Sequence, residues 1–436
     1  MLKIGDKKLI NAWAFYDWAN SVYSLVISTA VFPIYYAGLT TSEGFANADG
    51  KVAFLGTLWT PTTLYNYALA FSFLVVALLS PMLSGIADYA GNKKKFLKGF
   101  CLLGSLSVMC LFFFTGKETL WVGIVFSILA SIGFWGSIVF YNSYLPEIAH
   151  PEQQDNVSAK GFMLGYVGSI ILLILCLILI ETEVFGMYDK QFGSQVSFVL
   201  VGLWWLGFAQ ITYSRLPTPE KSKLPKDNYF VKGLKELRKV AKELFGYREL
   251  KVFLISFFLL SIGVQTIILM AGIFGTVLGL PTLNLIGTIL LVQFVGILGA
   301  FLFSRLSNKI GNITTLKITI VIWGVVCFIG FNLTKDTPNV DIYFYVLGAL
   351  IGLVMGAIQS LARSTYSKLL PETEDNTSYF SFFDVTEKIA LVIGMITYGI
   401  LISLTGSMQW SVLALAIFFL ASFITISTMR KTKYVK

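Results

Sequence analysis

The chain has 436 residues, of which 56% are hydrophobic, 15% aromatic and only 13% charged. An ordinary soluble domain has about 25% charged residues, so this composition excludes a soluble enzyme. The net charge of +9 is spread over loops between apolar segments, whereas a nucleic-acid-binding protein gathers such charge on one polar face. The composition therefore predicts an integral membrane protein that has the lipid bilayer, and no nucleic acid, as a partner.

Twelve segments are long and apolar enough to cross a bilayer, which takes about 17 to 25 residues. They lie at 12–37, 64–87, 96–115, 119–142, 160–180, 196–214, 251–275, 284–304, 314–333, 342–366, 379–404 and 409–429. The first follows three lysines, as a signal peptide would, but its length and its polar residues favour an uncleaved span. The predicted fold class is an all-α integral membrane protein with twelve transmembrane helices.

The basic residues give the orientation. If the N-terminus is cytoplasmic, the inner segments hold 29 Lys and Arg residues and the outer loops hold 4. Positively charged loops stay on the cytoplasmic side of a membrane. The sequence therefore predicts a multi-pass protein of the inner (plasma) membrane with both termini in the cytoplasm.

Cysteine and histidine set a limit on the chemistry. The four cysteines lie inside apolar segments without CxxC spacing, and the one histidine, His150, lies in a loop. This pattern predicts no disulfide framework, metal site or resident cofactor. Proton transfer inside the membrane would have to use carboxylates.

A polar stretch divides the chain. Hydropathy breaks at 216–219, and a charged segment follows up to Lys251, so we expect a six-helix bundle at 1–214, a linker at 215–250 and a second bundle at 251–436. Within the linker, apolar residues recur at helical spacing opposite basic ones: Phe230, Val231, Leu234, Leu237, Val240, Leu244 and Phe245 against Lys232, Lys235, Arg238, Lys239 and Lys242. Such a helix either lies on the inner leaflet or forms a solvated linker that touches the loops.

The two halves repeat one another. SGIADYAGNKK at 84–94 matches SRLSNKIGNIT at 304–314 at an offset of 220 residues, and DNVS at 155–158 matches DNTS at 375–378 at the same offset. A duplicated six-helix unit is the plan of certain secondary transporters, which place the substrate site between the halves. We expect two pseudo-symmetric six-helix bundles.

The loop between the second and third spans carries a family resemblance. GIADYAGNKK at 85–94 is similar to the signature of the major facilitator superfamily, with Gly85, Asp88, Gly91 and Lys93 in register and Tyr89 where a basic residue is usual. The resemblance implies that Asp88 holds the inner ends of spans 2 and 11 together in the outward-facing state.

Three further segments narrow the resemblance: WAFYDWANS at 13–21, VFPIY at 31–35 and YNSYLPE at 141–147. They resemble a bacterial branch related to the autophagy-linked vacuolar amino-acid effluxers. The resemblance implies solute efflux, with amino acids as the substrate class.

Polar residues inside the spans are candidates for a transport pathway, because ionisable groups are costly in a membrane. In span 1, Asp17, Asn20, Ser21, Ser24 and Ser28 share one helical face. Asp17 is the candidate for binding a proton or a substrate ammonium group, and the alternative is a hydrated or ion-paired structural acid.

In span 11, Asp384, Glu387 and Lys388 lie within five positions, with Asp384 and Lys388 at the i, i+4 spacing of an ion pair. They form either a titrating group or a static ion-pair network that joins helix ends, and the network is favoured because all three are expected near the cytoplasmic face. Arg363 in span 10 would bind a substrate carboxylate or an acid at the inner gate, and the gate is favoured.

The remaining candidates for substrate or proton binding are neutral: Tyr141, Asn142, Gln265, Gln293 and Gln359. Gln265 and Gln293 suit hydrogen bonding to a polar solute, or joining neighbouring helices. Glycines at 161, 165 and 168 share a face of span 5 and are expected to allow close helix packing.

These features together predict a secondary active transporter, monomeric and not an enzyme, that moves a small polar solute by alternating access. Ion-coupled efflux of amino acids, with a proton or another coupling ion, is the favoured version. Sugars, peptides or organic ions are alternative solutes. A transporter-like sensor and a membrane-embedded enzyme are alternative classes, although no nucleophile and base stand out. The chain has no GxxxxGK[ST] loop for ATP.

Overall fold

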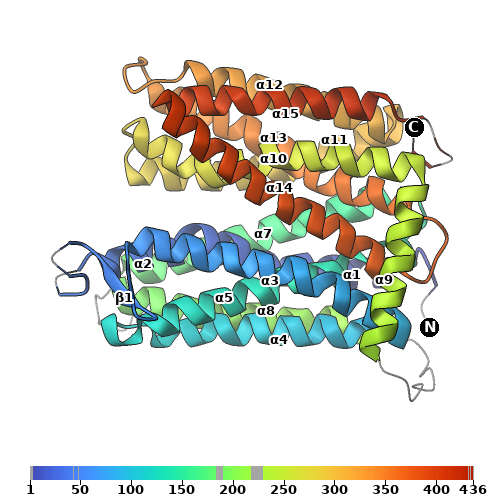
Figure 1. Cartoon of the computed structure of the whole chain (residues 1–436), viewed down its shortest axis with the longest axis horizontal. Helices are drawn as coiled ribbons and strands as arrows, with labels where there is room; N and C mark the ends of the chain where they lie inside the picture. Colours follow the sequence, from blue (N-terminus) through green and yellow to red (C-terminus); the bar gives the residue numbers. More distant parts are fainter. Residues whose placement is uncertain are drawn as a thin grey trace.

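The computed structural model describes residues 3–42, 44–47, 49–182, 190–217, 229–430, 432 and 434–435. Twelve of the described helical segments are long and apolar enough to cross a membrane, and each overlaps one predicted segment, so the predicted fold class is confirmed. The helices run side by side, and both chain termini lie at the same end of the bundle (Figure 1). This end is called the terminus side below.

The first half contains six spans. The first is built from α1 (Lys7–Val22), the π-helix η1 (Tyr23–Val31) and α2 (Phe32–Thr40). A β-hairpin of β1 (Val52–Phe54) and β2 (Thr57–Trp59) follows on the side opposite the termini. The remaining elements are α3 (Pro61–Ala90), α4 (Lys93–Cys110), η2 (Leu111–Phe113), η3 (Lys117–Thr119), α5 (Leu120–Asn142), α6 (Leu145–Ile148), α7 (Gln154–Glu181) and α8 (Lys190–Arg215).

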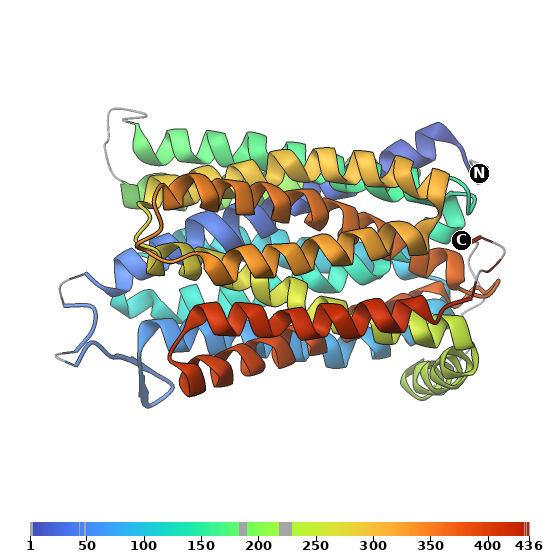
Figure 2. The same ribbon diagram turned by 90° about the horizontal axis from the view of Figure 1, so that it is seen from above.

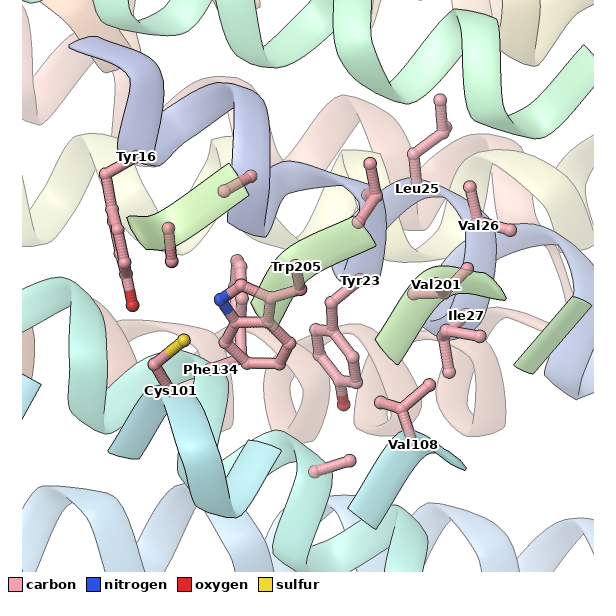
Figure 3. Close-up of a cluster of buried hydrophobic side chains, with 14 of the residues drawn as sticks. Tyr16, Tyr23, Leu25, Val26, Ile27, Cys101, Val108, Phe134, Val201 and Trp205 are labelled. Carbon is pink, nitrogen blue, oxygen red and sulfur yellow. The ribbon is translucent and has the colours of Figure 1, made fainter. Parts of the chain in front are cut away.

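The second half contains the other six spans. They are α10 (Arg248–Val277), α11 (Thr282–Ile310), α12 (Asn312–Asn332), α13 (Val340–Leu369), α14 (Asn376–Thr405) and α15 (Met408–Ser427). Each half has its own hydrophobic core. In the first half, Tyr16, Tyr23, Cys101, Phe134 and Trp205 pack together between α1, α4, α5 and α8 (Figure 3).

The linker contains the helix α9 (Tyr229–Gly246), which crosses the terminus side at a steep angle to the spans and is seen nearly end-on in Figure 2. Val240 and Leu244 are buried in the core of the second half, while Phe245 is exposed. Lys239 pairs with Asp375 at 3.0 Å. The helix therefore packs on the protein at the terminus side. The side chains of residues 229–234 and 236 lie outside the described part.

The first span changes its winding halfway. From Tyr23 the α-helix continues as nine residues of π-helix, with the Thr29 hydroxyl donating to the Ser24 carbonyl oxygen at 2.9 Å. The segment ends at Val31, and Pro33 lies in the first turn of α2, where the missing N–H of proline is tolerated. Because a π-helix has wider turns than an α-helix, Ser24 and Ser28 do not follow the face that regular α-helical spacing predicts.

Several helices extend past their apolar segments on the terminus side. α14 begins at Asn376, although its apolar segment begins at 379, and the polar Thr377 and Ser378 are fully buried. Polar side chains tolerate such burial only when they are hydrogen-bonded. These helix ends therefore indicate polar contacts between the two halves.

Candidate functional site

A buried ion pair joins the halves. Arg363 of α13 points its guanidinium at Asp17 of α1, with both Nη1 and Nη2 at 3.3 Å from Asp17 Oδ2, and the two side chains are only 3% and 8% exposed. The guanidinium also donates to Asn142 Oδ1 at 3.1 Å, Ser158 Oγ at 2.9 Å and the Ser158 carbonyl oxygen at 2.8 Å. The Tyr141 hydroxyl donates to Asp17 Oδ2 at 2.8 Å. The arginine thus has a partner for each nitrogen.

Aromatic rings enclose this arginine. Its guanidinium carbon lies 4.2 Å from the ring centre of Phe162, 4.8 Å from that of Trp13 and 5.5 Å from that of Tyr141. Trp13 stacks on Tyr141 with ring centres 4.5 Å apart and donates its indole N–H to the Tyr141 carbonyl oxygen at 3.0 Å. Aromatic rings stabilise a cation and exclude water, so the Asp17–Arg363 pair is shielded from solvent on this side.

Glycine makes room for the pair. A Cβ atom at Gly161 of α7 would lie 2.3 Å from Asp17 Oδ2, and one at Gly165 would lie 2.5 Å from Ser21 Oγ. Such contacts are shorter than any side chain accepts, so α7 approaches α1 this closely only with glycine at both positions. At Gly161 the close approach serves the ion pair as well as helix packing.

A second contact lies nearer the end of the bundle. Asp88, in the last turn of α3, accepts hydrogen bonds at the N-terminus of α14: from Ser378 N and Oγ at 2.7 Å each, and from Thr377 N at 3.2 Å. A carboxylate is stabilised there by the free N–H groups and by the helix dipole. Gly91 ends α3 in the left-handed conformation, with φ of 60°.

Lys93, the first residue of α4, pairs with Glu147 of α6. Glu147 also accepts a hydrogen bond from Asn376 of α14 at 3.1 Å. The structure thus brings the predicted gating residues Asp88 and Lys93 to the start of α14. Gly85 is buried in α3, one turn before Asp88.

A second contact of this kind, also on the terminus side, joins α7 to α11 and α13, and its residues were not among the predicted site residues. Asp155 of α7, fully buried, pairs with Lys368 at 2.8 Å and accepts hydrogen bonds from Ser307 at 2.8 Å and Asn312 at 2.9 Å. Asp155 and Asn312 both lie in the repeated motifs. The repeat was therefore the signal that identifies this contact.

The span 11 cluster lies farther from the terminus side than the sequence suggested. Lys388 pairs with Asp384, approaches Glu387 at 3.8 Å and lies 3.8 Å from the ring centre of Trp135 in α5. Glu387 accepts a hydrogen bond from Gln265 of α10 at 2.6 Å. Lys388 is twelve residues into α14, or about 18 Å at 1.5 Å per residue. The cluster therefore does not join helix ends.

The other predicted residues are dispersed. Gln359 accepts a hydrogen bond from Tyr166 of α7 at 2.7 Å. Asn20 is buried, Ser21 and Ser24 are partly exposed in the first span, and Gln293 is partly exposed in α11. In the described part of the chain, no group of three or more His, Cys, Asp and Glu residues is placed to hold a metal ion.

The predicted residues thus form two separate centres. Asp17, Tyr141, Asn142 and Arg363 meet between the halves, and Gln265, Asp384, Glu387 and Lys388 meet around α14. The first centre and the contacts of Asp88 and Asp155 join the halves at the terminus side. In this structure the halves are therefore closed to that side.

Known proteins resemble the chain over nearly its whole length. Residues 5–434 match the family described as vacuole effluxer Atg22 like. The uncharacterized MFS-type transporter YxiO of Bacillus subtilis is 31% identical, over 96% of this chain and 94% of that protein. Autophagy-related protein 22 of Coccidioides immitis is 24% identical, over 93% and 83%. Among solved structures, the major facilitator superfamily transporter FucP in the outward conformation superposes with a TM-score of 0.66 at 14% identity, covering 98% of both chains.

Proposed function

Because the chain belongs to the Atg22-like effluxer family of the major facilitator superfamily, and is thus a membrane transporter, we propose that it exports amino acids or closely related zwitterions by alternating access, coupled to protons. The observation that carries this proposal is the Asp17–Arg363 pair, one charge from each half, buried where the halves meet. The basic loops support a cytoplasmic terminus side, so the structure corresponds to a state closed to the cytoplasm.

The pair is complementary to a zwitterion. When the halves separate on the terminus side, Asp17 and Arg363 move apart, and each loses its buried partner. An amino acid presents an ammonium group to Asp17 and a carboxylate to Arg363, whose planar guanidinium suits bidentate binding of a carboxylate. The substrate therefore gives Asp17 and Arg363 the counter-charges that they lose when the halves open.

Closure reverses this exchange. As the halves approach, Asp17 and Arg363 pair with each other again, and Tyr141, Asn142 and Ser158 complete their hydrogen bonds. The substrate loses both of its binding groups at the moment when the path to the terminus side closes. It is then released to the opposite side, which is the direction of export.

Counterflow in proteoliposomes tests the proposal. Vesicles loaded with unlabelled amino acid should accumulate the labelled one, and a compound lacking either the ammonium or the carboxylate group should compete at least tenfold less well. Asp17→Asn and Arg363→Gln should each abolish counterflow. Arg305→Gln is the matched control, since Arg305 is an exposed arginine of α11.

Two outcomes would contradict this reading. If sugars or peptides exchange and no amino acid does, the substrate class is wrong. If no solute of the panel shows saturable exchange under any gradient, a sensor function replaces transport.

A further inference from the structure

The cluster on α14 has an unbalanced charge. Asp384 and Glu387 are two acids that share one base, Lys388, so the ionised cluster has a net charge of −1. Asp384 and Lys388 are 5% and 3% exposed. The Asp17–Arg363 pair, by contrast, is neutral by itself. An uncompensated charge at this depth of a membrane protein calls for one further positive charge.

One atom of the cluster has no partner. Asp384 Oδ1 accepts from Lys388, while Asp384 Oδ2 is buried without a hydrogen bond. Glu387 Oε1 accepts from the amide nitrogen of Gln265, which is a donor and not a cation ligand. A metal cation needs several oxygen ligands around it, and among the described residues no group of three or more His, Cys, Asp and Glu gathers here. A proton needs one free carboxylate oxygen.

We propose that Asp384 and Glu387 together hold the single proton that is exchanged for substrate, and that Asp17 does not carry it. The inference rests on the proposed function. The two acids lie three positions apart on α14 and share Lys388, so one proton is enough to balance the charge of the cluster. Binding neutralises the cluster, and release restores its negative charge.

The cluster is placed to sense the position of the halves. Lys388 lies over the ring of Trp135, which belongs to α5 of the first half, so the cation contacts both halves at once. Trp135 in turn packs on Phe73 of α3, with ring centres 6.0 Å apart. Separation of α14 from α5 would remove the ring from Lys388 and open the carboxylates to water. Proton exchange is thereby tied to the same movement that breaks the Asp17–Arg363 pair.

Other charged groups facing α14 lie away from the cluster. α5 and α15 have no charged residue within their bounds. Asp88 of α3 and Glu243 of α9 contact the start of α14, at residues 377–379, and the charged residues of α10 lie at its beginning, 248–251. The charge of the cluster is therefore set by Asp384, Glu387 and Lys388 themselves.

The test separates exchange from coupling. Four proteins are reconstituted: wild type, Asp384→Asn, Glu387→Gln and the control Glu372→Gln. Glu372 is an exposed acid in the loop before α14. Each protein is measured for amino-acid counterflow and for amino-acid accumulation driven by a pH gradient. We expect both cluster variants to keep counterflow within about threefold of wild type and to lose gradient-driven accumulation at least tenfold. The control should keep both activities.

A spectroscopic readout is independent of transport. The infrared carbonyl band of a protonated carboxyl group should titrate in the detergent-solubilised protein and be lost in the two cluster variants. If both variants keep gradient-driven accumulation and the band, or if a sodium gradient replaces the pH gradient, the inference is wrong. If wild type shows no amino-acid counterflow while the band titrates and is lost as expected, the proposed substrate fails and the proton site stands.

Discussion

Replacing Arg363 by methionine tests the buried pair most directly. Methionine keeps much of the apolar volume of the arginine side chain but removes its charge and its hydrogen bonds. Asp17 would then remain buried without its cation, and Asn142 Oδ1 and the Ser158 carbonyl oxygen would lose their donor. These losses apply to the closed state, because Arg363 belongs to the second half and these partners belong to the first.

The size of the effect follows from the burial of the pair. Removing one partner of a buried ion pair costs about 3 to 5 kcal/mol, because the other charge is left uncompensated. At about 1.36 kcal/mol per factor of ten, the equilibrium between the closed state and the state open to the terminus side shifts roughly 150- to 5,000-fold toward opening. The double variant Asp17→Asn/Arg363→Met leaves no unpaired charge, so it should recover most of that loss.

Crosslinking across the terminus side measures this shift. Asn156 and Asn308 are exposed, belong to different halves and are joined by a hydrogen bond of 3.1 Å, so cysteines at both positions should react with a short bifunctional thiol reagent when the halves are closed. The four native cysteines are first replaced. Crosslinking should fall strongly in Arg363→Met, recover in the double variant and stay unchanged in Arg305→Met.

The reasoning fails if Arg363→Met crosslinks as well as its parent protein. It also fails if the double variant is no better than the single one, since the loss would then come from packing and not from the stranded charge of Asp17. Thermal unfolding of each variant shows whether a lowered yield reflects opening or loss of the fold.

Asp88→Asn should lower the closed fraction in the same assay about tenfold, because an uncharged amide is a weaker acceptor for the start of α14 than a carboxylate is. Gly161→Ala should open the terminus side as well, because its Cβ would lie 2.3 Å from Asp17 Oδ2, and counterflow should drop with it. Gly356→Ala, whose Cβ would lie 2.2 Å from a backbone oxygen of α11, should destabilise the fold by about 1 to 3 kcal/mol in thermal unfolding. Gly399→Ala, with no atom within 4 Å, is its control and should leave stability unchanged.

The twelve spans were predictable because burial in lipid imposes a length and a composition on each of them. Their ends were not. α14 begins three residues before its apolar segment, and α11 continues six residues past its own, to Ile310. These extra turns are polar, and they are helical because their side chains bond across the halves, as Ser307 does with Asp155. Hydropathy along one chain segment has no information about such partners.

The candidate site was predictable in part, again because the membrane constrains which residues its spans can hold. The free-energy cost of placing a charge in a membrane marks Asp17, Arg363 and the acids of α14 as unusual, but it does not say which acid pairs with which base. Asp17 and Arg363 are separated by 346 positions, and the packing of α7 against both α1 and α13 brings them together. The π-helix after Val22 had no sequence signal, so the single polar face expected for the first span could not be corrected from the sequence.

The repeat explains why the two kinds of contact differ. The contacts near the terminus side occur twice: the end of α3 meets the start of α14, and the end of α11 meets the start of α7, with Asp88 and Asp155 as the acceptors. A duplicated unit produces such paired helix contacts, although the acceptor lies at the end of α3 in one and at the start of α7 in the other, and they can close the halves without distinguishing one solute from another. The Asp17–Arg363 pair and the Lys388 cluster each occur once, with an acid of α1 facing α13 and a base of α14 facing α5. Selectivity and coupling need an asymmetric site, because the substrate and the proton are different ligands. The residues that break the symmetry of the repeat are therefore where the chemistry of transport should be sought.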